Sequence, residues 1–192
     1  MICILCILLL LAGGAQSSPS GNLVVNGDAR AGTNGWRSRG VASVEEFLGV
    51  QCFVVRNSGS FQQLIRMPGN AGGKYAALVA RGESERINGL DGSITGLPYL
   101  YAMPATEPPT RFLGHWQGQQ MRGSPTDPSE WVVMSGIFLV PEGTMNLVLD
   151  LSQAERKDSP QDGSAARFAD VQVRLFDTEA GARAFVREYS RR

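Results

Sequence analysis

The segment 145–151 strongly constrains the fold, because every second residue along it is large and apolar. Its odd-numbered residues are all large and apolar: Met145, Leu147, Leu149 and Leu151. Its even-numbered residues are Asn146, Val148 and Asp150. A period of two is typical of a β-strand that buries one face in a core and exposes the other. The segment therefore predicts a strand with its leucines inside.

Two neighbouring segments, 131–140 and 166–176, also read as strands. Pro141 and Gly143 favour a turn between the first of them and segment 145–151. The simplest interpretation is a meander of three strands in succession. Further strands are expected at 22–26, 41–47, 49–56, 61–66, 74–81 and 111–122, with a tight hairpin turn at 57–60. The periodicity fades over 82–109, which is expected to be irregular. These patterns predict an all-β protein.

Length and composition agree with a single turn-rich β domain. The chain has 192 residues, among them 23 glycines and 10 prolines, which allows one sizeable core but hardly a second domain. Its 18 basic and 18 acidic residues cancel. Because a chain without net charge lacks the long-range field that nucleic acids and anionic membranes attract, neither is expected as a partner.

The N-terminus has the pattern of a secretory signal peptide, with an apolar run followed by small residues around Ala15 and Ser17. We expect residues 1–17 to be removed, no membrane span to remain, and the protein to be secreted or otherwise extracytoplasmic. An uncleaved membrane anchor is the alternative. Cleavage would remove Cys3 and Cys6, so Cys52 would have no disulfide partner. Its place in an apolar strand predicts a small buried residue rather than a reactive thiol.

The remaining chain divides into a β domain at 18–176 and a C-terminal helix or tail at 177–192. Asp177 or Thr178 is expected to cap the helix N-terminus. In the β domain, Trp36 follows a glycine-rich loop at the start of a strand. It is expected to anchor the core.

Three stretches together carry a resemblance to a known family: Asn22–Asp28 leading through glycines to Trp36, the segment 131–144, and the segment 168–173. In this order and spacing the chain resembles the carbohydrate-binding modules of the galactose-binding-like jelly-roll superfamily. The resemblance implies a two-sheet antiparallel β-sandwich, a jelly roll, here followed by the short C-terminal helix. It also implies a structural calcium ion, for which the matching positions are Asp28 and Asp170.

Glycan binding requires a flat aromatic ring to stack on a sugar and planar polar groups to bridge its hydroxyls. The candidate rings are Tyr99, Tyr101 and Trp116. The candidate polar partners are Arg86, His115, Gln117 and Gln119. Because Trp116 would lie on the opposite strand face from Gln117 and Gln119, only one of these two sets can line a given groove.

The residues do not favour an enzyme. His115 is the only histidine, which excludes a histidine-rich metal site, and Ser135 lacks the glycine pattern of a nucleophile elbow. Glu83, Glu85 and Asp91 could supply a carboxylate pair, but acidic residues in a polar segment are commonly just solvated. The leading hypothesis is therefore a secreted, non-catalytic module that binds a glycan or a glycosylated surface. The alternative is a module of the same fold that binds another protein and no sugar.

Overall fold

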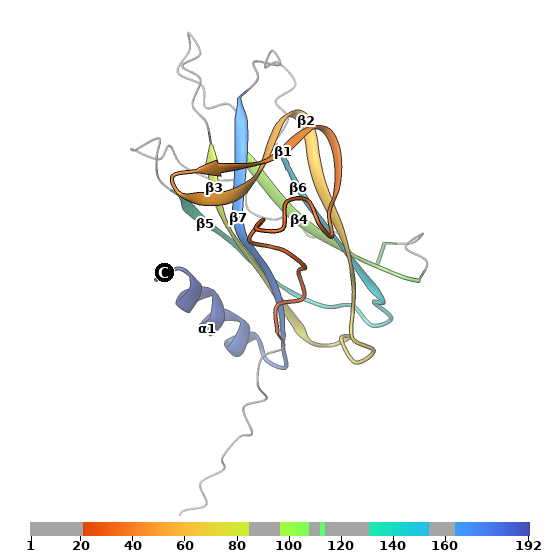
Figure 1. The fold of residues 1–192 in the computed structure, drawn as a ribbon. Helices are drawn as coiled ribbons and strands as arrows, with labels where there is room; N and C mark the ends of the chain where they lie inside the picture. The colour runs from red at the N-terminus through yellow and green to blue at the C-terminus, as the bar shows by residue number, and fades with distance from the viewer. Residues whose placement is uncertain (1–20, 85–96, 108–111, 114–130, 154–163) are drawn as a thin grey trace, which may run out of the picture.

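The computed structural model describes residues 21–84, 97–107, 112–113, 131–153 and 164–192, and within them the chain is almost entirely β (Figure 1). The strands are β1 (Arg37–Phe47), β2 (Val50–Arg66), β3 (Tyr75–Ser84), β4 (Pro98–Ala105), β5 (Val132–Leu139), β6 (Asn146–Gln153) and β7 (Ala165–Phe176). One helix, α1 (Glu179–Tyr189), follows them. The predicted fold class, all-β with a short C-terminal helix, is confirmed.

The strands pair in an order that differs from their order in the chain. The hydrogen-bonded path runs β4-β6-β2-β7-β3-β5, with β1 on the remaining side of β2, and every pairing is antiparallel. Strands β5 and β6 follow each other in sequence but do not pair. The expected meander is therefore wrong, because alternation predicts which face of a strand is buried but not which strand lies beside it.

Strand β2 continues through the segment that composition marked as a tight turn. Around it the pairing with β1 shifts, from Arg56 opposite Val41 to Ser60 opposite Arg39. The extra residues of β2 form a bulge, which bends the strand. Gly59 is needed there, since a Cβ atom at this position would lie 2.2 Å from the Val41 carbonyl oxygen. The predicted hairpin turn is thus a bend within one long strand.

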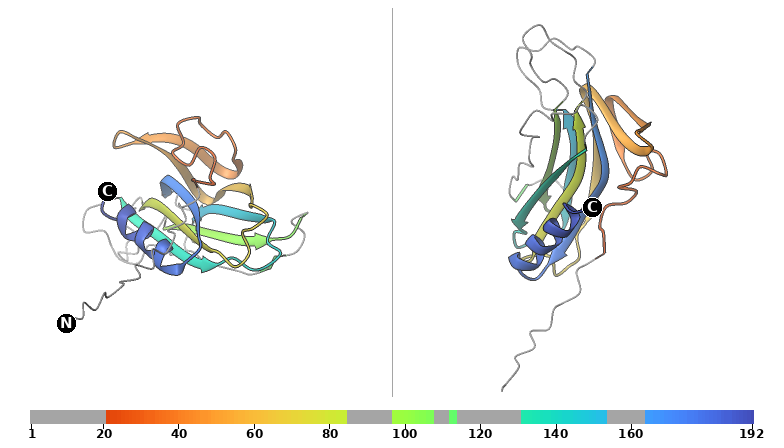
Figure 2. Two further views of the ribbon diagram at one scale, coloured as in Figure 1. Left: turned by 90° about the horizontal axis from the view of Figure 1, so that it is seen from below. Right: turned by 90° about the vertical axis from the view of Figure 1, so that its left-hand side faces the viewer.

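The bend lets β2 belong to both halves of the molecule. Its first half pairs with β7 through residues 53–56, and its second half pairs with β6 through residues 60–66. The strands curve around the interior, and β1 and β2 lie over the others as a second layer (Figure 2). This is the β-sandwich that the resemblance implied.

The interior is formed by one face of every strand. The predicted alternation in β6 is confirmed, since Leu147, Leu149 and Leu151 are fully buried. Trp36 is buried as well, with its ring centroid 4.8 Å from that of Phe53. Its indole N–H donates to the Val25 carbonyl at 3.1 Å. Trp36 is therefore the expected core anchor, and it also holds the N-terminal loop.

The segment 22–26, predicted to be a strand, is irregular instead. It is attached to β7 through Asn22, whose side-chain oxygen accepts hydrogen bonds from the main-chain N–H groups of Val24 and Val173, at 3.1 and 3.0 Å. A further anchor comes from β2, where the buried Gln63 side chain bonds both the N–H and the carbonyl of Val25, each at 2.9 Å. Side-chain hydrogen bonds thus replace a strand ladder here.

Strand β4 lies within the stretch 82–109 that was expected to be irregular. Strand propensities miss β4 because it contains Pro98 and Pro104, and proline cannot donate a hydrogen bond to a sheet ladder. The two prolines are nevertheless compatible with a strand here, since β4 is at the end of the hydrogen-bonded path. Edge strands tolerate proline, because one side of their backbone needs no ladder partner.

Helix α1 packs on β3, β5 and β7. Thr178, one of the two predicted caps, accepts a hydrogen bond from the Gly181 N–H at 3.1 Å. Tyr189 is buried, and its hydroxyl donates to the Asp170 carbonyl at 2.8 Å. No helix in the described part of the chain is long and apolar enough to cross a membrane. Cys52 is fully buried, which raises the pKa of its thiol to about 11 and confirms it as an unreactive core residue.

Candidate functional site

The structure describes two of the predicted glycan-contacting residues, Tyr99 and Tyr101, and places both on β4. The other five lie outside the described residues: Arg86, His115, Trp116, Gln117 and Gln119. We therefore built the candidate site outward from the two tyrosines, following the strand register across the sheet.

The register defines an outer face that spans four strands, which we call the Tyr99 face. Directly paired residues in an antiparallel sheet point to the same side. The face therefore consists of a first row of Tyr99, Ser152, Ser60 and Arg39, a second row of Tyr101, Asp150, Gln62 and Arg37, and a third row of Met103, Val148 and Leu64. An aromatic edge on β4 is thus joined through a polar centre to a basic edge on β1.

The two tyrosines form an aromatic pair at one edge of this face. Their ring centroids are 5.3 Å apart and their planes are tilted by 42°. Both side chains are half-buried, so each ring is held in place and still reaches solvent. Burial and the neighbouring Asp150 carboxylate together raise the pKa of Tyr101 to about 12. Both hydroxyls are therefore protonated donors at neutral pH.

Asp150 is the most unusual group on the Tyr99 face. It is only 2% exposed. Its Oδ2 atom accepts a hydrogen bond from the Gln62 amide at 2.6 Å, whereas no described residue hydrogen-bonds its buried Oδ1 atom. Burial raises the pKa of this carboxyl group, although the hydrogen bond from Gln62 acts in the opposite direction. Buried polar atoms are nearly always hydrogen-bonded, so an unpartnered one calls for an explanation, and a donor from a bound molecule is one such explanation.

Together these groups can bind a molecule that has both an apolar ring face and hydroxyl groups. The tyrosines offer rings for stacking, while Asp150 offers a carboxylate one strand away and Gln62 an amide two strands away. Asp150 and Gln62 were not among the predicted site residues. The alternation of segment 145–151 already assigned Asp150 to the outer face, but its pairing with Gln62 joins residues 88 positions apart. That pairing is not visible in the sequence.

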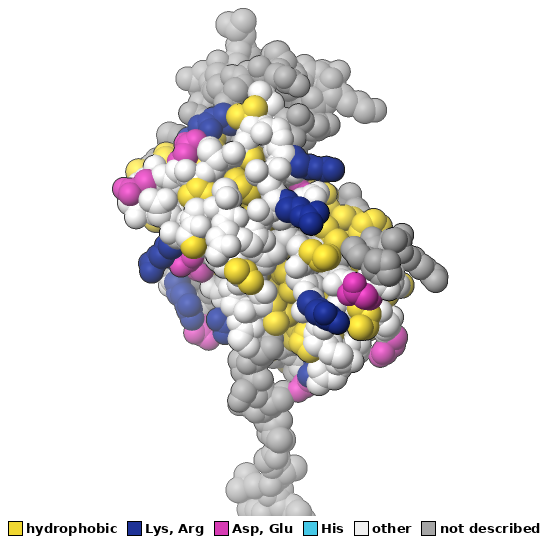
Figure 3. All heavy atoms as spheres, turned by 45° about the vertical axis from the view of Figure 1, so that its right-hand side comes forward, with side chains coloured by type: hydrophobic (Ala, Val, Ile, Leu, Met, Phe, Trp, Pro, Cys, Tyr) yellow, Lys and Arg dark blue, Asp and Glu magenta, His cyan; other side chains and the backbone are white. Residues whose placement is uncertain are grey.

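The side of the molecule along which β2 runs is mixed rather than strongly apolar. Figure 3 brings forward the right-hand side of Figure 1, where the long strand β2 runs, and basic side chains stand apart from one another there among hydrophobic and uncharged ones. Of the residues on the Tyr99 face, Leu64 is a large hydrophobic side chain that is mostly exposed, at 55%.

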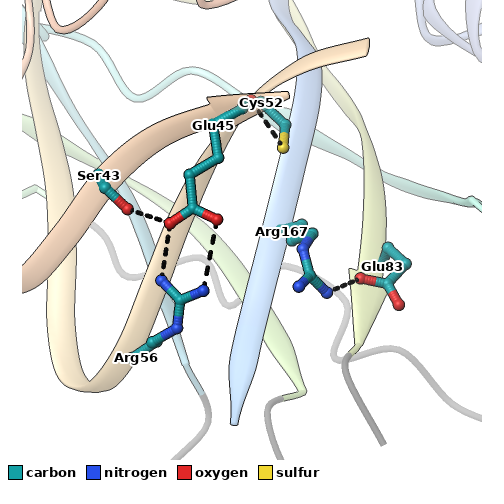
Figure 4. A network of polar contacts seen from close by, with 6 residues as sticks. All are labelled: Ser43, Glu45, Cys52, Arg56, Glu83 and Arg167. Atoms are coloured by element: carbon teal, nitrogen blue, oxygen red, sulfur yellow. Dashed lines mark hydrogen bonds and ion pairs between the residues drawn. The ribbon is translucent and has the colours of Figure 1, made fainter. Parts of the chain in front are cut away.

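Two other carboxylates, Glu83 and Glu45, are not part of the Tyr99 face, and both are engaged by arginines (Figure 4). Glu83 on β3 contacts Arg167 on β7, with 2.6 Å between carboxylate oxygen and guanidinium nitrogen, and both side chains are buried. Glu45 contacts Arg56 at 2.8 Å, and this pair is partly exposed. Hydrogen bonds from Arg56 and Ser43 lower the pKa of Glu45. Carboxylates held in this way stabilise the fold and are poorly suited to exchanging protons with a substrate.

The predicted calcium ligands lie on either side of a close main-chain contact. The Val171 N–H donates to the Gly27 carbonyl at 2.9 Å, which brings Asp28 and Asp170 to the same region. Asp28 is exposed and its carboxylate contacts Arg30 at 3.5 Å, while Asp170 accepts a hydrogen bond from the Gln172 amide at 2.8 Å. The described residues include no cluster of three or more histidine, cysteine or acidic side chains.

Calcium takes about six to eight oxygen ligands. An ion between Asp28 and Asp170 would therefore depend largely on main-chain carbonyls. Both carboxylates already have other partners in the structure. The calcium site stays a prediction.

Comparisons with known proteins give matches at the level of structure. No protein-family model matches the sequence, and neither does any curated protein. Among solved structures, the tandem CBM22-1–CBM22-2 domain of Paenibacillus barcinonensis Xyn10C aligns over 84% of this chain and 48% of its own, at a TM-score of 0.53 and 14% identity. The module TmCBM61, solved with β-1,4-galactotriose, aligns over 80% of this chain and 98% of its own, at 0.50 and 15%.

The enzymatically active domain of tailspike protein 4 from bacteriophage CBA120 also aligns, over 81% of this chain, with a TM-score of 0.59 and 13% identity. This chain spans only 21% of that domain. At such identities the likeness concerns the fold alone. Within that limit the predicted resemblance is confirmed: the chain has the β-sandwich fold of carbohydrate-binding modules.

Proposed function

We propose that this protein is a secreted, non-catalytic module that binds a glycan on its Tyr99 face. The observation that carries the proposal is the arrangement of two half-buried tyrosine rings, 5.3 Å apart, beside a buried carboxylate whose second oxygen has no described partner. The β-sandwich fold of known carbohydrate-binding modules supports it.

Each group has a physical role in this proposal. The rings of Tyr99 and Tyr101 present flat apolar surfaces to the C–H face of a sugar, while the Tyr101 hydroxyl is hydrogen-bonded to the Asp150 carboxylate. The free Asp150 oxygen accepts a hydrogen bond from a sugar hydroxyl. A hydrogen bond to a charged group contributes about 1.5 to 3 kcal/mol. Because Gln62 holds the other Asp150 oxygen at 2.6 Å, the carboxylate is oriented before the ligand arrives.

The arrangement favours binding over catalysis. Hydrolysis of a glycosidic bond commonly requires two carboxyl groups on either side of it. Among the described residues, Asp150 is the one acidic group of the Tyr99 face, and Glu83, one of the predicted alternatives, is bound by Arg167 on β7. Glu85 and Asp91 lie outside the described residues. A glycan also fits this face better than a protein partner does, because its centre is polar and its apolar row of Met103, Val148 and Leu64 lies at one side.

The test is a glycan-array screen of residues 18–192, followed by calorimetric titration of the best ligand into wild type and variants. Tyr101→Ala removes one ring and is expected to lower the affinity at least tenfold. Tyr75→Ala is the matched control, since Tyr75 is also half-buried on a strand but lies on β3, outside the Tyr99 face. It should leave the affinity unchanged.

Circular dichroism must show that each variant is folded. A folded wild type that binds no glycan would refute the proposal and favour the protein-binding alternative. An equal loss of affinity in Tyr101→Ala and Tyr75→Ala would mean that the protein binds a glycan, but not on the Tyr99 face. Arg86, His115, Trp116, Gln117 and Gln119 stay predicted contacts, and their alanine variants belong in the same titration.

The calcium ion between Asp28 and Asp170 is part of the proposal as a structural ion only. If it binds, calcium added to EDTA-treated protein will raise the thermal midpoint, because a ligand that binds only the folded state stabilises it. The variant Asp170→Asn should lose most of that rise. Identical midpoints with calcium and with EDTA would refute the site.

A further inference from the structure

The basic edge of the Tyr99 face is not used by the proposed contacts. Arg37 and Arg39 are two residues apart on β1, so they point to the same side, and both are exposed. Arg37 is paired in register with Gln62, and Arg39 with Ser60. Among the described residues neither arginine makes an ion pair. Two guanidinium groups are therefore available to a ligand at this edge.

The arginines are separated from the tyrosines by the width of the sheet. Neighbouring strands in a sheet are about 4.8 Å apart. Tyr101 on β4 and Arg37 on β1 are three such intervals apart, or about 14 Å. Asp150 and Arg37 are two intervals apart, or about 10 Å. This span is long enough for a short oligosaccharide that crosses the strands. A ligand whose ring stacks on Tyr101 would thus extend towards the arginines.

The charges along this line are opposite at its two ends. Asp150 is the one acidic member of the Tyr99 face, and it lies beside the tyrosines. An anionic group placed there would be repelled and would give no hydrogen bond to the free Oδ1 atom. At the other end, two arginines favour an anion, since the guanidinium fork matches carboxylate and similar oxyanions.

We propose that the glycan bound by the Tyr99 face is partly acidic. An uncharged sugar lies over Tyr99 and Tyr101, and an anionic substituent on a neighbouring sugar contacts Arg37 and Arg39. The substituent is a carboxylate, as in a uronic acid, or a sulfate ester. This inference rests on the proposed function and adds the chemical class of its ligand.

The test compares polysaccharides that share a backbone and differ in charge. Polygalacturonate is used in its fully methyl-esterified, partly esterified and fully de-esterified forms. A partly sulfated galactan and its desulfated product form a second arm, which distinguishes sulfate from carboxylate. The partly charged forms should bind best, because they alone offer an uncharged sugar to the tyrosines and an anion to the arginines. Added salt should weaken their binding but not that of the uncharged forms.

The decisive variant is Arg37→Ala/Arg39→Ala. It is expected to lower the affinity for a partly charged form by roughly three- to tenfold, as for two exposed ion pairs, and to leave that for the uncharged form unchanged. Arg187→Ala/Arg191→Ala is the matched control, because both residues are exposed at the end of α1, which packs on other strands.

The outcomes separate this inference from the proposed function. Equal, salt-independent binding of charged and uncharged forms would refute the acidic ligand and keep the glycan module. An affinity that falls equally in both double variants, or that survives Tyr101→Ala, would show general electrostatic attraction and overturn the inference. Failure of every glycan to bind would refute the proposed function itself.

Discussion

Two buried carboxylates of this protein have nearly the same exposure but different surroundings. Asp150 and Glu83 are each 2% exposed. Glu83 is held by the Arg167 guanidinium at 2.6 Å, whereas Asp150 is held by the uncharged Gln62 amide at the same distance. A buried charge is costly unless it is paired. Glu83 is thus stabilised within the fold by an opposite charge, while Asp150 keeps an oxygen that no described residue hydrogen-bonds. Burial alone does not distinguish a structural carboxylate from a binding one.

Removing the partner of Glu83 should give the largest effect. Arg167→Met leaves a buried carboxylate without its cation and is expected to lower the free energy of unfolding by about 3 to 5 kcal/mol. It also removes the contact of the guanidinium with the Phe47 ring, 4.3 Å from its centroid. Urea-induced unfolding measures the change.

The double variant Glu83→Met/Arg167→Met serves as the control. It should recover most of the lost stability, because an apolar pair of similar volume replaces a buried ion pair at little cost. A loss below about 1 kcal/mol in Arg167→Met alone would contradict the contrast between the two carboxylates.

Neutralising Asp150 should change the free energy of unfolding in the opposite direction. Asp150→Asn keeps the shape of the side chain, and we expect it to raise the free energy of unfolding at neutral pH by roughly 0.5 to 1 kcal/mol, as substitutions that relieve a strained binding site do. Glycan affinity should fall at the same time. A variant that is less stable than wild type, with binding intact, would make Asp150 a structural residue.

The pH dependence follows from the raised pKa of Asp150. In the unfolded chain its carboxyl group ionises near its ordinary pKa of 3.8, before the folded one does. The unfolded state then binds fewer protons, so stability falls as pH rises from that value through the folded pKa. The advantage of Asp150→Asn should therefore grow over this window and level off above it. Unfolding measured at a series of pH values tests this.

The half-exposed pair of Glu45 and Arg56 should give the smallest effect. Glu45→Gln is expected to cost less than about 1 kcal/mol at neutral pH, because solvent screens such pairs. Since hydrogen bonds from Arg56 lower the pKa of Glu45, its stabilisation is present above the ordinary value of 4.5 and is lost as pH falls through the folded pKa. The difference in the free energy of unfolding between Glu45→Gln and wild type should therefore be smallest in acid. A core cavity would not show this pH dependence.

The sequence predicted which side of each strand is buried better than it predicted the pairing of strands. The leucines of β6, Trp36 and the Thr178 cap are all as expected, because each depends on neighbours close in the chain. The pairing of β6 with β2 and β4 depends on distant segments and was missed. Strand β4 was missed because the prolines within it obscured the edge strand.

The same distinction applies to the candidate site. Tyr99 and Tyr101 could be proposed from residue type, since exposed aromatic residues near turns suit sugar binding. Asp150 was assigned to the outer face but not recognised as part of a site. Its significance depends on Gln62 and on the free Oδ1 atom, and both follow from tertiary contacts. Local patterns can thus suggest a ligand surface, while its polar groups require the fold.

The bend in β2 also couples the local unfolding of the strands that pair with its two halves. Because residues 53–56 pair with β7 and residues 60–66 pair with β6, neither layer can detach without breaking the ladder of this one strand. Main-chain amides on both sides of Gly59 should therefore exchange with deuterium at similar, slow rates, as parts of one cooperative unit. Bound ligand would then slow exchange beyond the strands it contacts, for example in β7, which pairs with the first half of β2.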